Sequence, residues 1–134
     1  MFDPLLPIPT DADLLAAAGE LVGPAIRRQT WLLTLDDEQR LGPVISRIDD
    51  VPVDADPVAI EQLARMLRAL TDEIDEVASV VLVWERPGDA EVRMQEADWI
   101  AGLAESGAPI RAQLLSSDDS VRLVDPAFAA LVAR

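Results

Sequence analysis

Apolar residues recur along the chain in two arrangements, one with helical spacing and one as short continuous runs. Residues 11–23 and 56–76 carry apolar side chains three and four positions apart, so both segments are predicted helices. The second has the stronger pattern, and its apolar face is formed by Ile60, Leu63, Met66, Leu67, Leu70 and Ile74. We expect that face to cover a sheet.

Capping residues indicate where these helices begin and end. Thr10 or Asp11 can cap the first helix, and Gly23–Pro24 ends it. Asp56 followed by Pro57 opens the second, because proline at the first helical position loses no hydrogen bond. Residues 1–10 include three prolines and are predicted to form an extended arm.

Short apolar runs predict the strands. Residues 30–35 and 41–48 flank a polar turn and are predicted to pair as a β-hairpin. Residues 79–84 are apolar throughout, which is typical of a central strand covered on both faces. Further elements are a helix over 94–105, strands over 110–115 and 121–124, and a short helix opened by Asp125–Pro126.

This order of elements predicts the fold class. Helix, hairpin, helix, strand, helix, two strands and helix fit an α/β fold, a single-domain α/β sandwich with a mixed sheet. The domain spans 1–134, with the arm at 1–10, the N-terminal helix at 11–23 and the α/β core at 30–124. The N-terminal helix can pack on its own domain or on a second subunit; we favour self-packing and leave a homodimer open.

Composition narrows the chemistry. The chain has no His, Lys or Cys, which argues against catalysis by those residues, against disulfides and against thiolate metal ligands. Twenty-five acidic residues against eleven arginines give a net charge of −14, so neither nucleic acid nor an anionic membrane is an expected partner. The first residues lack the basic region of a signal peptide, and no apolar run is long enough to span a membrane; we expect a cytoplasmic protein.

The central strand and the loop after it resemble the JAB/MPN domain in its bacterial RadC-like form. In that family the strand leads into a His-x-His-Pro loop, and a Ser-x-x-Asp motif opens the next helix. Here the loop reads Trp84-Glu85-Arg86-Pro87-Gly88, and the helix opening reads Gln95-Glu96-Ala97-Asp98. Pro87 and Asp98 match the family's motif, while Trp84 and Arg86 stand at the histidine positions and Gln95 at the serine.

The resemblance implies an α/β fold over about 30–124. The family holds zinc with the two histidines and the aspartate, and this sequence departs from the motif at both histidine positions. Indole at Trp84 has no lone pair to donate, and Arg86 adds a permanent positive charge. Asp98 alone cannot hold zinc. The resemblance therefore implies a pseudoenzyme, with no metal site and no cofactor.

The candidate ligand loop consists of Trp84, Glu85, Arg86 and Asp98, and each has a structural alternative. Asp98 in the first turn of a helix is favourable for dipole reasons alone. Arg86 can hold an anionic ligand, but an exposed ion pair with Glu85 or Asp89 is the preferred interpretation. Trp84, with Trp99, can wall a pocket, but both are more commonly core residues.

Two further polar clusters contain residue types found in metal sites or catalytic sites. Oxygen ligands for Mg²⁺ or Ca²⁺ are available in the acidic loop and hairpin turn, at Asp49, Asp50, Asp54, Asp56, Asp36, Asp37 and Glu38, but solvated acids are the preferred interpretation. The serines of 116–120 have no base to activate them and are interpreted as a turn.

Three functional hypotheses follow. The first is a non-catalytic, JAB/MPN-like protein-interaction or scaffold domain with a protein partner. The second is an enzyme acting on a small molecule or with a metal through carboxylates and arginine, with Asp98, Arg86 and Glu85 as its residues. The third is an acidic regulatory module that binds a basic protein. The second requires a pocket, and the third predicts binding that weakens steeply with salt.

Overall fold

A computed structural model describes residues 7–8, 10–48 and 51–133, with only the backbone given for 43–45. Most of the predicted arm, and Asp49 and Asp50 of the acidic loop, lie outside the described residues. Within the arm, Ile8 is buried and its backbone N–H donates to the carbonyl of Gln39 at 2.7 Å, so this residue packs against the hairpin turn.

The predicted elements are all present, in the predicted order. They are α1 (Asp11–Val22), β1 (Gln29–Leu35), β2 (Leu41–Ile48), α2 (Pro57–Glu73), β3 (Ser79–Glu85), α3 (Met94–Glu105), β4 (Ile110–Ser116), β5 (Val121–Leu123) and α4 (Pro126–Val132). The predicted caps are also formed. The side chain of Thr10 accepts from the N–H of Asp13, and that of Asp56 accepts from the N–H of Ala59.

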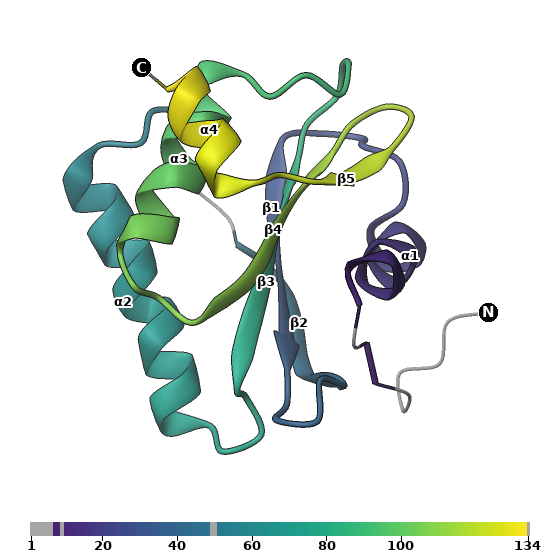
Figure 1. Ribbon diagram of the computed structural model, residues 1–134, viewed down its shortest axis with the longest axis vertical. Coiled ribbons are helices and arrows are strands. Elements are labelled where there is room, and N and C mark those ends of the chain that lie inside the picture. Colours follow the sequence, from purple (N-terminus) through teal and green to yellow (C-terminus); the bar gives the residue numbers. More distant parts are fainter. Residues whose placement is uncertain (1–6, 9, 49–50, 134) are drawn as a thin grey trace.

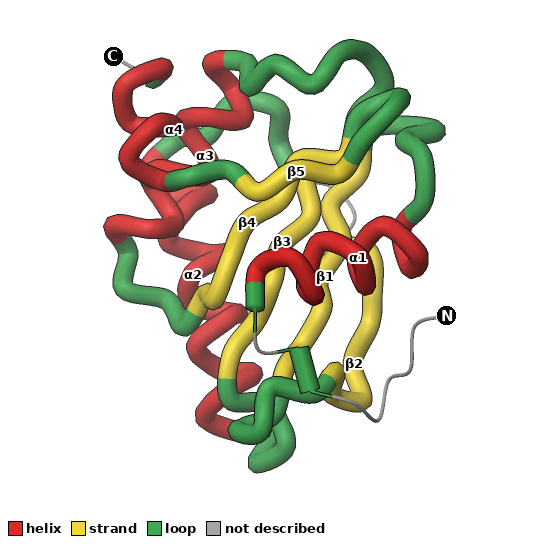
Figure 2. Tube along the Cα trace, turned by 45° about the vertical axis from the view of Figure 1, so that its right-hand side comes forward, coloured by secondary structure: helices red, strands yellow, loops and turns green. Residues whose placement is uncertain are grey.

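The described strands form one mixed sheet in the order β2-β1-β3-β4-β5. Strand β1 runs antiparallel to both β2 and β3, and β4 runs antiparallel to β5. Only β3 and β4 are parallel, and α3 makes the crossover that connects them. The sheet separates two helical layers, with α1 on one face and α2, α3 and α4 on the other (Figures 1 and 2). The predicted α/β sandwich with a mixed sheet is confirmed.

The side chains of β3 pack alternately against the two helical layers, because successive side chains of a strand point to opposite faces of the sheet. Val80, Leu82 and Trp84 pack with α2, α3 and α4, whereas Val81 and Val83 pack with α1. Strand β3 is therefore buried on both faces, as its apolar run predicted.

The helices cover the sheet largely as their patterns predict. In α1, Leu14, Ala17 and Ala18 are buried against the sheet of their own domain, so the self-packing interpretation is confirmed. In α2, Leu63 and Leu67 are buried, but Met66 is exposed. The predicted burial of Met66 was wrong. The buried stripe of α2 is narrower than the predicted apolar face, and it runs through Ala64 instead. No helix in the described ranges is both long and apolar enough to cross a membrane.

Candidate functional site

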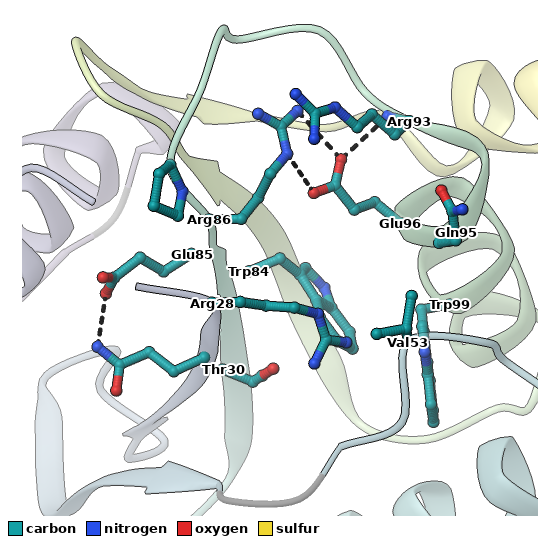
Figure 3. A pocket seen from close by; sticks show the side chains of 12 residues that line it. Arg28, Thr30, Val53, Trp84, Glu85, Arg86, Arg93, Gln95, Glu96 and Trp99 are labelled. Carbon is teal, nitrogen blue, oxygen red and sulfur yellow. Dashed lines mark hydrogen bonds and ion pairs between the residues drawn. The ribbon is translucent and has the colours of Figure 1, made fainter. Parts of the chain in front are cut away.

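A pocket of about 390 Å³ lies at the carboxyl end of β3, the end from which the chain crosses over to α3. Its walls come from the start of β1, the end of β3, the loop before α2 and the first turns of α3 (Figure 3). In α/β sheets this end of a parallel strand is the usual place for a ligand. We call this the β3 pocket; its polar lining includes Arg28, Thr30, Glu85, Arg86, Arg93 and Gln95.

Trp84 and Trp99 form the apolar side of the β3 pocket. Their rings lie 5.6 Å apart between centroids and are tilted by 33°. Each indole N–H is satisfied inside the protein: Trp84 donates to the side chain of Gln113 at 3.0 Å and Trp99 to the carbonyl of Pro52 at 2.9 Å. Both side chains are buried, so the preferred core interpretation is confirmed, while their edges still line the pocket.

Arg86 is held by a buried ion pair. Its Nε lies 2.6 Å from Oε2 of Glu96, and its Nη2 lies 3.2 Å from Oε1. Nη1 and Nη2 also donate to the carbonyls of Asp89 and Glu91, respectively. The side chains of Arg86 and Glu96 are only 8% and 14% exposed, so the prediction of an exposed ion pair was wrong for Arg86. Nη1 of Arg86 does lie 4.0 Å from Oδ1 of Asp89, but the closer partner is Glu96 on α3, and that pair ties the loop after β3 to the helix.

Glu85 points to the opposite side of β3 and is also satisfied. Its Oε1 accepts from the side chains of Gln29 at 3.1 Å and Trp31 at 2.7 Å. Its Oε2 accepts from the backbone N–H groups of Ile26 at 2.9 Å and Arg27 at 3.3 Å. Burial alone would raise the pKa of this carboxyl, but the four hydrogen bonds outweigh it and hold the pKa below its usual value. Glu85 therefore anchors the segment between α1 and β1.

Asp98 does not lie in the pocket with the other residues of the predicted ligand loop. It is half-buried on α3, is not part of the pocket lining, and lies beyond the first turn, where the acid is Glu96. The helix begins at Met94, so the dipole explanation belongs to Glu96. The structure thus brings Trp84, Glu85 and Arg86 together and leaves Asp98 out.

The other clusters have structural roles. Asp36 accepts from the N–H groups of Glu38 and Arg40 in the hairpin turn, and Asp56 caps α2. The hydroxyl of Ser117 binds the backbone of Ser120, so this cluster forms the predicted turn. No group of three or more His, Cys, Asp or Glu side chains suited to a metal occurs within the described ranges.

Sequence reasoning missed Arg28, Thr30 and Arg93. Thr30 is buried at the start of β1, and its hydroxyl has no hydrogen-bond partner among the described residues. The guanidinium of Arg93 likewise has none there, and Figure 3 shows it beside the guanidinium of Arg86. These residues come from segments far apart in the chain, and no local pattern singles them out.

A second hollow, of about 730 Å³, adjoins the β3 pocket. The two share Arg28, Gln29, Thr30 and Val53, and both open to solvent. We call the two together the groove. Its open shape suits an extended chain, and its free donors can bind and orient a ligand.

Comparison with known proteins found no family model and no curated protein that matches this chain.

Proposed function

We propose that this chain is a non-catalytic, JAB/MPN-like domain that binds an extended segment of a partner protein in the groove. The proposal takes the cytoplasm as its compartment, as expected from the sequence. It combines the resemblance of the loop after β3 with the state of the side chains in that loop.

One observation carries the proposal. Trp84 and Arg86, which stand at the histidine positions of the resembled family, are both engaged by internal partners, Gln113 and Glu96. Their roles are structural, and the groove beside them keeps donors that no internal group uses. Such a surface is suited to binding, because it offers hydrogen-bond donors without an evident nucleophile or general base.

The enzyme hypothesis has one supporting feature, the pocket that it requires. Its named residues fit less well. Arg86 already donates four hydrogen bonds to internal acceptors, Glu85 accepts four, and Asp98 lies outside the pocket. A general base must reach a proton of the substrate, and a carboxylate with four donors already bound is poorly suited to that task.

Titration of the ¹⁵N-labelled protein with capped pentapeptides tests the proposal. The probes are acetyl-Ala-Leu-X-Leu-Ala-amide with X as Glu, Gln or Lys, followed by NMR up to about 10 mM peptide. We expect saturable shifts at the indole N–H of Trp99 and the backbone N–H of Thr30 with at least one probe. If none of the three shifts these groups, a peptide-binding function for the groove is wrong.

A further inference from the structure

Among the described residues, the lining of the groove carries an excess of arginine on a strongly negative chain. Four arginines line it, and among the described residues only two carboxylates do. The arginines are Arg27, Arg28, Arg86 and Arg93, and the carboxylates are Glu85 and Glu96. The whole chain carries −14. A local excess of arginine against that background marks the groove as different from the average surface.

The two carboxylates are not available to neutralise the outer arginines. Glu96 pairs with Arg86, and Glu85 accepts four hydrogen bonds, none of them from an arginine side chain. Arg28 donates to the carbonyls of Val51 at 2.9 Å and Pro52 at 3.1 Å. Carbonyls are neutral acceptors, and no carboxylate of the described residues pairs with Arg28.

Arg93 is an exposed cation, and its guanidinium lies close to that of Arg86. A methyl group placed on Gly88 would lie 3.0 Å from Nη2 of Arg93 and 3.3 Å from Nη1 of Arg86. The two guanidiniums therefore approach the same point, although Arg86 alone has a carboxylate partner in the described chain. Like charges held together are unfavourable, and a bound anion would relieve the repulsion.

We infer that the groove recognises a carboxylate on the partner segment, held by Arg93 and Arg28, with a neighbouring apolar side chain against Val53 and Trp99. This inference rests on the proposed function. A guanidinium pairs with a carboxylate through parallel hydrogen bonds, and half-exposed Val53 supplies an apolar contact in the same groove. A carboxylate carries one charge, so the −14 chain repels it less than a phosphate monoester.

The same pentapeptides test this inference, with phosphoserine as a fourth X. We expect the Glu peptide to bind up to about fivefold more tightly than the Gln peptide, the size of one exposed ion pair. The Lys peptide is expected to bind most weakly. Equal binding of Glu and Gln peptides, or tighter binding of the Lys peptide, would overturn the inference and leave the peptide groove standing. Tighter binding of the phosphoserine peptide would overturn the assignment to a carboxylate.

Two variants separate the groove from overall charge. Arg93→Gln removes the cation and retains the backbone N–H at this position, which donates a hydrogen bond to Oε1 of Glu96. Arg65→Gln on α2 changes the net charge equally, but Arg65 lies away from the groove, exposed beside Glu61. We expect Arg93→Gln to abolish the preference for the Glu peptide over the Gln peptide, and Arg65→Gln to preserve it. Loss of the preference in both variants would show a whole-protein effect and overturn the role of Arg93.

Discussion

Glu85→Gln is expected to destabilise the protein by about 2–4 kcal/mol at neutral pH. The glutamine side chain has the same shape, but only one of its two terminal atoms accepts hydrogen bonds. Whichever way the amide is turned, two N–H donors then face its NH₂ group: those of Gln29 and Trp31, or those of Ile26 and Arg27. These contacts are part-buried, so each donor left without an acceptor costs about 1–2 kcal/mol, the lower part of the range for buried groups, and the total is a large share of a typical stability.

The effect should depend on pH in a defined direction. The native pKa of Glu85 lies below its usual value of 4.5, so the charged form stabilises the fold above about that pH. This contribution is lost as pH falls from 4.5 through the lowered native pKa, because the carboxyl then becomes protonated in the native state too. The stability difference between wild type and Glu85→Gln should therefore be largest near pH 7 and shrink below pH 4.5.

Urea unfolding followed by tryptophan fluorescence at several pH values measures this difference. Glu73→Gln is the matched control, because Glu73 is an exposed glutamate on α2 and its replacement changes the net charge equally. Two results would refute the reasoning: a loss below about 0.5 kcal/mol at pH 7, or a difference that stays constant down to pH 3.

Three further predictions follow from the packing and the site. Arg86→Met should lower the free energy of unfolding in urea by about 3–5 kcal/mol, because it leaves Glu96 buried without its cation. Adding Glu96→Gln should restore part of that loss, and a loss unchanged by the second substitution would contradict the buried pair. Gly102→Ala should cost about 1 kcal/mol, since its new methyl would lie 2.6 Å from Cδ1 of Ile60, and in an Ile60→Val background the same change should be neutral or stabilising. Thermal unfolding with Zn²⁺, Mn²⁺, Mg²⁺ or Ca²⁺ should give no saturable stabilisation that Asp98→Ala abolishes; a site saturated a hundredfold over its Kd would add about 2.7 kcal/mol, so such a shift would contradict the non-catalytic assignment.

The elements could be predicted from the sequence because their signals are local. The Asp56–Pro57 pair fixes the start of α2, and Gly23, at a φ of 72°, ends α1 in a conformation that favours glycine. The apolar run of β3 indicated a strand covered on both faces. What the pattern could not give is the width of a buried stripe, and Met66 of α2 was assigned to the wrong side for that reason.

The site was only partly predictable because its decisive contacts span long separations. Glu85 and Arg86 follow an apolar strand and look like the start of a solvent-exposed loop. Their burial depends on donors at Ile26 to Trp31, more than fifty positions away, and on Glu96 across the turn. Arg28 enters the site because β1 lies beside β3, a pairing that no local sequence pattern specifies.

The net charge of the chain and the charge of the groove favour ligands of opposite sign, and the distance dependence of electrostatic interactions explains why both can hold. At physiological ionic strength, salt screens exposed charges beyond about 8 Å, so most of the 25 acids act weakly on a ligand already in the groove. Contacts within the groove act at hydrogen-bond distance, where a free guanidinium dominates. The −14 charge should therefore govern which partners approach, while Arg28 and Arg93 govern which group is held. An acidic chain with an arginine-lined groove can thus select a carboxylate locally, and composition alone could not have revealed that preference.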